Sequence, residues 1–289
     1  MKTARASADE LIRNHYRQQA EKHGASPCST MEDEIVRERE LELIVNFLAA
    51  TGRASRKRAR RVLDLGCGNG HPLEVVQSAH PANRYWGIDF SEDLLELARA
   101  RKLAGCDLRR GDARALPYPD AFFDLLYSER CLINILDWKG QKKALTEIQR
   151  VLRPGGYCLL IECFTDGLEN NNRARRELGL PDIAPAYHNR YMEKNRFLAA
   201  IQGRFAVVQP ESLDHYARGY RFRSNFLSSH YFVSRVLYPA VLKGELVRNS
   251  EFVKFFSFLP LIGNYSAIQA FFLKKAPGKG KTGRSKGSK

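Results

Sequence analysis

Short apolar runs alternate with amphipathic stretches along residues 61–163. The runs RVLDLG, RYWGID, AFFDLLYS and YCLLIEC are rich in branched and aromatic residues, which is typical of buried strands. The stretches between them, such as KGQKKALTEIQRVL, repeat apolar residues every three or four positions, which predicts helices. This alternation favours an α/β fold, in which helices cover both faces of a parallel sheet.

The pattern continues less regularly on both sides of this region. RFAVVQP at 204–210 and SAIQAFFLKK at 266–275 are predicted to be two further strands. Two insertions, 165–200 and 211–262, separate the later strands, and segments of this length usually carry a function or structure of their own.

The N-terminal part is predicted to be helical. Residues 8–24 have the pattern of a helical arm. Thr30 and Asp33 are predicted to cap a second helix that runs to about Ala50.

Three parts are therefore expected along the chain. Residues 1–52 are predicted to form a helical arm, and residues 276–289 a disordered basic tail. Residues 53–275 are predicted to form the α/β domain, with the insertions 165–200 and 211–262 as a lid on the side where an acceptor would bind.

The net charge of +15 is concentrated in two runs. Residues 53–61 hold six basic residues and residues 274–289 hold seven, with no acid in either. The rest is nearly neutral, so no dedicated nucleic-acid groove is predicted. The second run is either a solubilising tail or a peripheral contact with an anionic membrane or RNA.

The cysteine pattern and the hydropathy indicate the cellular environment of the protein. The six cysteines form no CxxC pair, so we expect reduced thiols and no metal site. The N-terminus has no apolar signal region, and no window holds eighteen apolar residues. A cytoplasmic protein without a transmembrane segment is predicted.

The glycine-rich loop after the first predicted strand differs from a dinucleotide fingerprint. That fingerprint would place a third glycine at position 71, where the chain has His71. Asp64 stands within the strand, two residues before Gly66, and its charge would repel a phosphate and attract an ammonium or sulfonium. The loop therefore favours a nucleotide without phosphates.

Two further acids follow the next strands. Asp89 ends the second strand, 23 residues after Gly66, where a carboxylate can accept hydrogen bonds from ribose hydroxyls. Asp112 follows the third strand, where a carboxylate can bind the amino group of adenine. Ribose, adenine and a positive charge without phosphate describe S-adenosylmethionine.

Four motifs in order and in register resemble those of class I S-adenosylmethionine-dependent methyltransferases, the Rossmann-like type-11 group. They are VLDLGCGNG, GIDFS, GDARALPYPDAFFDLLYS and EIQRVLRPGGYCLLIE, over about residues 61–163. The resemblance implies a seven-stranded sheet of order 3-2-1-4-5-7-6 with strand 7 antiparallel. It also implies S-adenosyl-L-methionine as cofactor and S-adenosyl-L-homocysteine as product.

The resemblance also assigns cofactor-binding positions. Cys67, between two matched glycines, could alternatively be a small packing residue, and Tyr16 of the arm would either close over the cofactor or pack. The predicted cofactor-binding residues are Asp64, Gly66, Cys67, Gly68, Asp89, Phe90, Asp112, Ala113, Ser128, Glu129 and Tyr16.

The acceptor is less defined by the sequence. A hydroxyl acceptor benefits from a general base, and His188, His230 and Glu129 are the candidates, each with a structural role as the alternative. The aromatic insertion 211–262 favours a small organic acceptor, and the stretch from ERCLINILDW onward resembles bacterial methyltransferases of saccharide and natural-product pathways.

Three functions remain open at this point. The first is methyl transfer to an oxygen or nitrogen of a small acceptor, saccharide- or lipid-linked. The second is an RNA or protein methyltransferase guided by the basic segments, and the third is a partner protein that binds the cofactor without catalysis.

Overall fold

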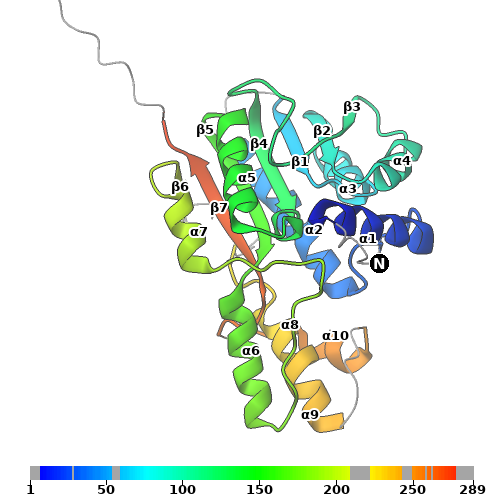
Figure 1. Cartoon of the computed structure of the whole chain (residues 1–289), viewed down its shortest axis with the longest axis vertical. Coiled ribbons are helices and arrows are strands. Elements are labelled where there is room, and N and C mark those ends of the chain that lie inside the picture. Colours follow the sequence, from blue (N-terminus) through cyan, green and yellow to red (C-terminus); the bar gives the residue numbers. More distant parts are fainter. Residues whose placement is uncertain are drawn as a thin grey trace, which may run out of the picture.

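A computed structural model describes residues 7–27, 29–53, 59–208, 222–242, 249–257, 259–261 and 263–277. Its centre is a seven-stranded sheet of order β3-β2-β1-β4-β5-β7-β6, which confirms the expected fold (Figure 1). β7 runs antiparallel to both β5 and β6, and the other pairings are parallel. The strands are β1 (Arg61–Leu65), β2 (Arg84–Asp89), β3 (Cys106–Arg110), β4 (Phe123–Glu129), β5 (Leu152–Cys163), β6 (Phe205–Val207) and β7 (Ile268–Lys275).

Helices cover both faces of this sheet, because each has one apolar stripe to bury. Apolar side chains of α2 and α3 pack in one core cluster, and those of α5 and α7 pack in a second cluster on the other face. The helices of the described residues are α1 (Ala8–His23), α2 (Glu34–Arg53), α3 (His71–Ala79), α4 (Glu92–Ala100), η1 (Leu132–Asn134), α5 (Trp138–Val151), α6 (Thr165–Glu177), α7 (Lys194–Ile201), α8 (Ser228–Phe232), η3 (Val233–Leu237), α9 (Tyr238–Leu242) and α10 (Glu251–Ser257).

The two N-terminal helices begin at polar caps. Ser7 and Glu10 form a reciprocal capping box at the start of α1. α2 begins at Glu34, and Asp33 accepts a hydrogen bond from the Val36 N–H at 3.1 Å. The expected capping role of Thr30 is wrong, because its hydroxyl instead accepts a hydrogen bond from Arg37 at 2.8 Å.

One strand is longer than the sequence indicates. The Pro154-Gly155-Gly156 stretch was expected to separate a helix from a strand that starts at Tyr157, but β5 already begins at Leu152. Leu152 pairs with Phe123 of β4, and the register then shifts before Leu125. The irregular pairing lets the strand pass through a glycine pair.

Several helices stand beyond the carboxyl ends of the parallel strands. α1 lies across this end of the sheet, and α6, α8, α9 and α10 form a lobe below it (Figure 1). We call these four helices, with η3 and the segments that join them, the lower lobe. The insertions thus contribute their described residues at the end where a parallel sheet binds ligands.

The opposite end of the sheet carries the described ends of the basic runs. Arg61 starts β1, and Lys275 ends the antiparallel β7 at the same end. Residues 54–58 and 278–289, like 209–221 and 243–248 of the predicted lid, lie outside the described residues. Within the described part of the chain, no helix is both long and apolar enough to cross a membrane.

Candidate functional site

The loop after β1 is shaped by glycines with left-handed backbone angles. Gly66 has φ +84°, and a side chain there would place its Cβ 2.8 Å from the Cβ of Cys131. Gly68 and Gly70 also have positive φ, at +52° and +77°. Only glycine adopts these angles without strain, so the loop turns sharply at the carboxyl end of β1 and leaves space above it.

Asp89 at the end of β2 holds this loop. One carboxylate oxygen accepts the Gly68 N–H and the other accepts the Ser91 N–H, each at 2.8 Å. Burial raises the pKa of Asp89, while these backbone hydrogen bonds act in the opposite direction. A carboxylate has about four lone-pair sites, so Asp89 keeps acceptor capacity toward a ligand.

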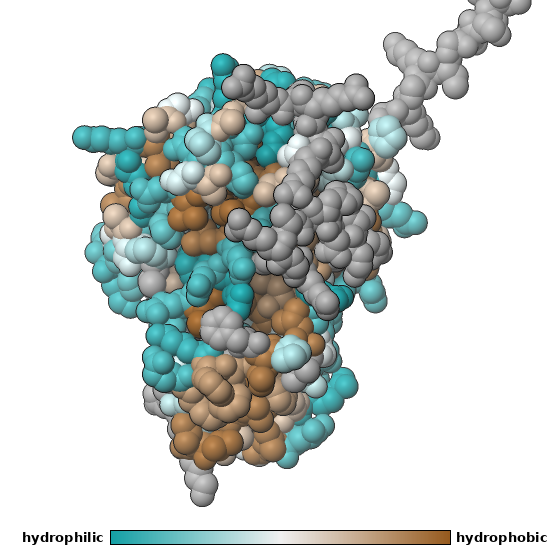
Figure 2. All heavy atoms as spheres, turned by 180° about the vertical axis from the view of Figure 1, so that it is seen from behind, coloured by the Kyte–Doolittle hydropathy of each residue, from teal (hydrophilic) through white to brown (hydrophobic). Residues whose placement is uncertain are grey.

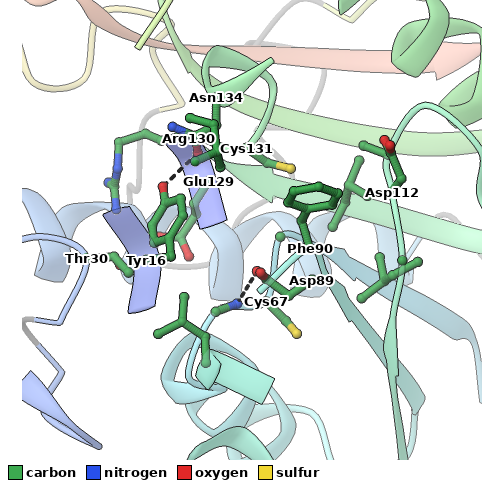
Figure 3. Close-up of a pocket in the computed structure, with 18 of the residues that line it drawn as sticks. Tyr16, Thr30, Cys67, Asp89, Phe90, Asp112, Glu129, Arg130, Cys131 and Asn134 are labelled. Carbon is green, nitrogen blue, oxygen red and sulfur yellow. Dashed lines mark hydrogen bonds between the residues drawn. The ribbon is translucent and has the colours of Figure 1, made fainter. Parts of the chain in front are cut away.

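A cavity opens between this loop, α1 and the ends of β2 and β4. Its empty space, including the part open to solvent, is about 990 Å³. Tyr16, Glu129 and Asn134 lie on one side and Asp112 on the other, with Asp89 and Phe90 between them (Figure 3).

Nine of the eleven predicted cofactor-binding residues line this cavity. Asp64 does not, because it is buried beneath the loop, where it accepts a hydrogen bond from the Tyr127 hydroxyl at 3.0 Å. Ser128 is fully buried and donates to Glu162 at 2.9 Å. The residues that line the cavity are Gly66, Cys67, Gly68, Asp89, Phe90, Asp112, Ala113, Glu129 and Tyr16.

Buried ion pairs lie at the side of the cavity where β4 ends. Glu129 accepts a hydrogen bond from Arg37 of α2 at 3.3 Å, and both side chains are more than nine-tenths buried. Arg130, with a strained φ of +51°, pairs with the fully buried Glu40. Burial raises the pKa of Glu129 to about 7; Arg37 opposes this shift and Glu40 adds to it.

This side of the cavity suits the amino-acid end of the cofactor. The carboxylate of Glu129 attracts an ammonium or sulfonium. Asp64 below the loop does not supply the charge expected of it, because burial raises the pKa of its carboxyl group well above the ordinary value. The Nε of Arg37 is buried without a hydrogen-bond partner, so it can donate to a ligand carboxylate. The hydroxyl of Thr30 also lines this side.

The hydrogen bonds of Asn134 determine that the Tyr16 hydroxyl is the donor in the contact between the two side chains. The Asn134 amide nitrogen donates to the His188 carbonyl at 3.3 Å and to Asn189 at 2.9 Å. A carbonyl only accepts, so the Asn134 oxygen must face Tyr16, whose hydroxyl donates to it at 2.7 Å. The oxygen of Tyr16 therefore offers only lone pairs to the cavity.

Asp112 is already engaged at the other side of the cavity. Arg114 forms a bidentate pair with it at 2.7–2.9 Å and also binds Asp9 of α1 at 2.8 Å. Burial raises the pKa of Asp112, but the hydrogen bonds from Arg114 outweigh it and hold that pKa below its ordinary value. Any contact between Asp112 and an adenine amino group has to share this carboxylate with Arg114.

The two histidines predicted as bases lie outside the cavity lining. His188 stacks on His15 of α1 with ring centroids 3.6 Å apart. Burial, with His15 adding to it, lowers the pKa of His188 to about 4. His230 is 2% exposed and its Nε2 lies 2.8 Å from Asp33, so it ties α8 to the cap of α2.

Three arginines that no motif of the sequence marked, Arg37, Arg114 and Arg130, also line the cavity. Arg37 could have been found, because it lies on the apolar face of its helix, four and seven residues before Leu41 and Ile44. A charged residue on a buried face indicates a partner. The described parts of the insertions line none of the cavity; their lid role stays a prediction.

Comparison with known proteins agrees with this geometry. Residues 62–156, which include the glycine loop, Asp89 and Asp112, match the protein family described as a methyltransferase domain. Residues 62–156 are a class I S-adenosylmethionine-dependent methyltransferase domain. The five cysteines of the described residues are all free thiols.

Curated relatives of the methyltransferase domain match part of their own length. The malonyl-[acyl-carrier protein] O-methyltransferase of Erwinia billingiae is 36% identical over 129 residues, which are 44% of this chain and 49% of that protein. The fatty-acid O-methyltransferase of Mycolicibacterium smegmatis is 33% identical over 127 residues, 43% of each chain. This chain spans about half the length of such relatives.

A solved structure shows the same fold over nearly the whole chain. It is phosphoethanolamine N-methyltransferase 1 of Haemonchus contortus, solved with phosphoethanolamine and S-adenosylhomocysteine. The TM-score is 0.57 at 15% identity, and the match covers 94% of this chain and 50% of that one. At this identity the likeness is one of fold.

The cavity of the methyltransferase domain fits S-adenosylmethionine. The carboxylates of Asp89 and Glu129 can still accept hydrogen bonds from a ligand. They suit ribose hydroxyls and a cation rather than phosphates. The arginines that line it are paired with carboxylates, apart from the unpartnered Nε of Arg37. Apolar side chains of Ile88 and Phe90 supply a surface for the base.

Proposed function

We propose that the protein transfers a methyl group from S-adenosylmethionine to a hydroxyl oxygen of a small, lipid-linked organic acceptor. The bound cofactor supplies a methyl group that is already activated on its sulfonium. The protein then needs to orient the two reactants and exclude water.

The observation that carries this proposal is the polarity of Tyr16. Its oxygen presents lone pairs to the cavity because its hydroxyl hydrogen is directed to the Asn134 amide oxygen in a hydrogen bond. Lone pairs select an acceptor that carries a hydrogen-bond donor, such as a hydroxyl, and would repel an ionised carboxylate. Burial raises the pKa of Tyr16, so the phenol keeps its proton and this hydrogen bond.

Other residues would position the reactants and keep water out. Ile12 and Tyr16 of α1 line the cavity, as does Ile135, which follows η1. Glu129, with a pKa of about 7, is available as a proton acceptor at neutral pH once a hydroxyl lies within reach.

The choice of an oxygen and of a lipid-linked acceptor is supported by the curated relatives, whereas the choice of a hydroxyl over a carboxyl group rests on Tyr16 alone. The names of two of them specify O-methyltransferases, one acting on malonyl-[acyl-carrier protein] and the other on fatty acids. Both acceptors are acyl compounds, so an acceptor with an acyl chain is favoured here.

The test is an assay with methyl-labelled S-adenosylmethionine and acceptors matched in chain length that end in a hydroxyl, a carboxylate or an amine. We expect label in the hydroxyl compound, with its position identified by mass spectrometry. Label that enters only the carboxylate would contradict the assigned polarity of Tyr16, and label that enters only the amine would contradict the choice of an oxygen. Label that enters only RNA or protein would contradict the acceptor class.

A further inference from the structure

Glu162 is a buried acid that pairs with no cation among the described residues. It is the next-to-last residue of β5 and is 0% exposed, so it takes no part in the mixed surface over the sheet or in the hydrophobic end of the lower lobe that Figure 2 shows. Glu40 and Glu129, two other buried acids at this end of the sheet, pair with arginines. A carboxylate buried without a cation costs stability unless hydrogen bonds compensate it.

The turn after β4 supplies these hydrogen bonds. One carboxylate oxygen of Glu162 accepts the Ser128 hydroxyl at 2.9 Å and the Cys131 N–H at 3.2 Å. The Leu132 nitrogen lies 3.1 Å from each oxygen, and the Ile133 N–H donates to the second oxygen at 3.3 Å. Backbone N–H groups can only donate, so this position requires a side chain that accepts with both of its ends. Burial raises the pKa of Glu162 to about 7, and these hydrogen bonds oppose the shift because they favour the charged form.

The turn that Glu162 holds carries two residues of the cavity. Cys131 and Asn134 both line the cavity, whereas Glu162 does not. The Asn134 N–H donates to the Cys131 carbonyl at 3.2 Å, so the position of Asn134 follows that of the turn. Glu162 can therefore act on the cavity only through the backbone of this turn.

We propose that Glu162 is a positioning residue that holds the turn after β4 where Asn134 meets Tyr16. Tyr16 donates to the Asn134 oxygen at 2.7 Å (Figure 3), and the Asn134 nitrogen donates to Asn189 at 2.9 Å. Both contacts require the turn at a fixed height, because the heavy atoms of such hydrogen bonds are only about 2.7–3.2 Å apart.

The consequence for methyl transfer rests on the proposed function, whereas the hold on Asn134 does not. By fixing Asn134, Glu162 keeps the lone pairs of Tyr16 directed at the acceptor hydroxyl. A misplacement of about 1 Å in such a group can lower a rate by about a hundredfold.

A double-mutant cycle separates this role from a purely structural one. A structural Glu162 would stabilise the domain as a whole, without a special link to Asn134. If Glu162 acts through Asn134, replacing it has no further effect once the Asn134 side chain is removed. E162Q suits the test, because glutamine keeps the size of the side chain but directs an amide N–H group at backbone donors.

The experiment is hydrogen exchange of the α1 amides in the full-length protein, as wild type, E162Q, N134A and the double variant. E147Q is the matched control, because Glu147 also accepts a backbone N–H, from Leu116 at 2.8 Å, but lies outside the cavity lining. S128A removes one donor to Glu162 and is the milder variant that decides if E162Q does not fold. Denaturant unfolding of the same samples reports the stability of the whole domain.

We expect E162Q and N134A each to speed exchange of the α1 amides by about fivefold, the effect of one lost hydrogen bond, and the double variant to exchange no faster than N134A. S128A should lie between wild type and E162Q, and E147Q should match the wild type in α1. Unchanged α1 exchange in E162Q, or in S128A where E162Q does not fold, would overturn the proposal. So would effects of E162Q and N134A that multiply in the double variant, or an acceleration spread equally over β1 and β4.

Methyl transfer to the hydroxyl compound and calorimetry with S-adenosylmethionine test the proposed function on the same variants. We expect E162Q to lower kcat by at least about tenfold and to keep cofactor affinity within about threefold of the wild type. Exchange that follows the cycle without any methyl transfer to the hydroxyl compound would contradict the proposed function and support the role of Glu162. Methyl transfer with an unchanged kcat in E162Q would overturn the role of Glu162 and leave the proposed function intact.

Discussion

Glu129 is the acid of the cavity whose protonation changes near neutral pH. Burial raises its pKa to about 7, so the carboxylate is charged above this pH and neutral below it. The charged form attracts the sulfonium and ammonium of the cofactor, and a bound cation in turn favours the charged form. The affinity for S-adenosylmethionine should therefore be linked to pH through this residue.

We predict that cofactor affinity is highest above pH 7 and falls by up to about tenfold per pH unit below it. The E129Q variant should bind more weakly at high pH and lack this pH dependence. Calorimetry across about pH 6–8 measures both proteins against the same ligand. The titration of the ligand itself affects both affinities equally and does not contribute to the difference between them. Parallel pH profiles for wild type and E129Q would contradict this role of Glu129.

His230 has a structural role in this account rather than a catalytic one. Its contact with Asp33 joins α8 to the start of α2, and both side chains are almost fully buried. Replacing it with alanine leaves the Asp33 carboxylate buried without this partner. We predict that H230A lowers the free energy of unfolding by about 3 kcal/mol.

Denaturant unfolding measures this loss. H71A is the control, because it also removes a histidine side chain, but one that lies outside the buried pair of His230 and Asp33. Cofactor affinity of H230A should stay within about threefold of the wild type, since His230 does not line the cavity. Unchanged stability together with abolished methyl transfer would instead assign His230 to catalysis.

The helix α1 closes the cavity through contacts at two points. Near its start, Asp9 binds Arg114 at 2.8 Å, and about two turns before its end Tyr16 donates to Asn134 at 2.7 Å. Asp9 is partly exposed, so its ion pair contributes at most about 1 kcal/mol. These contacts make α1 an element that can open locally without unfolding the domain.

We predict that D9A speeds hydrogen exchange of the α1 amides by up to about fivefold, because local opening becomes easier by up to about 1 kcal/mol. Amides of β1 and β4 should exchange as in the wild type. E21A is the matched control, an acid on the same helix. Equal exchange of α1 in D9A and wild type would show that Asp9 does not hold the helix.

At the level of elements, the sequence predicted the strands better than the ion pairs. The strands and most helices follow from periodicity, which is a local signal, whereas the strand order is what the family resemblance of the motifs implies. Arg37 and Glu129 are 92 residues apart, and Arg114 and Asp9 are 105 apart, so no local pattern joins them. Such contacts form when a helix docks on the sheet, and only charged residues on an apolar helix face signal them in advance.

At the scale of the whole molecule, the described parts of the basic runs and the cavity lie at opposite ends of the sheet. The cavity lies at the carboxyl ends of the parallel strands, whereas Arg61 and Lys275 mark the opposite end, where the described parts of both basic runs lie. The antiparallel direction of the last strand places Lys275 at the same end as Arg61. The sequence could not reveal that the cavity is lined by residues from 9 to 135, with no described residue of the insertions.

We predict that deletion of residues 278–289 leaves cofactor affinity and small-molecule methyl transfer within about twofold of the full chain. β7, which precedes this segment, ends on the side of the sheet away from the cavity, so we expect deletion to leave the binding of both reactants intact. Gel-shift titration with RNA, run beside the methyl-transfer assay, shows whether the tail binds nucleic acid. A large loss of methyl transfer on deletion would favour an acceptor guided by the basic segments.

Binding of S-adenosylmethionine tests the central claim most directly, and isothermal calorimetry of wild type and D89A measures it. Asp89 fixes the glycine loop and keeps acceptor capacity for the ribose, so its loss removes both contributions. The account predicts one binding site in the wild type and affinity at least about a hundredfold weaker in D89A, a difference of about 3 kcal/mol. Absence of binding in the wild type, or equal affinity in D89A, would contradict it.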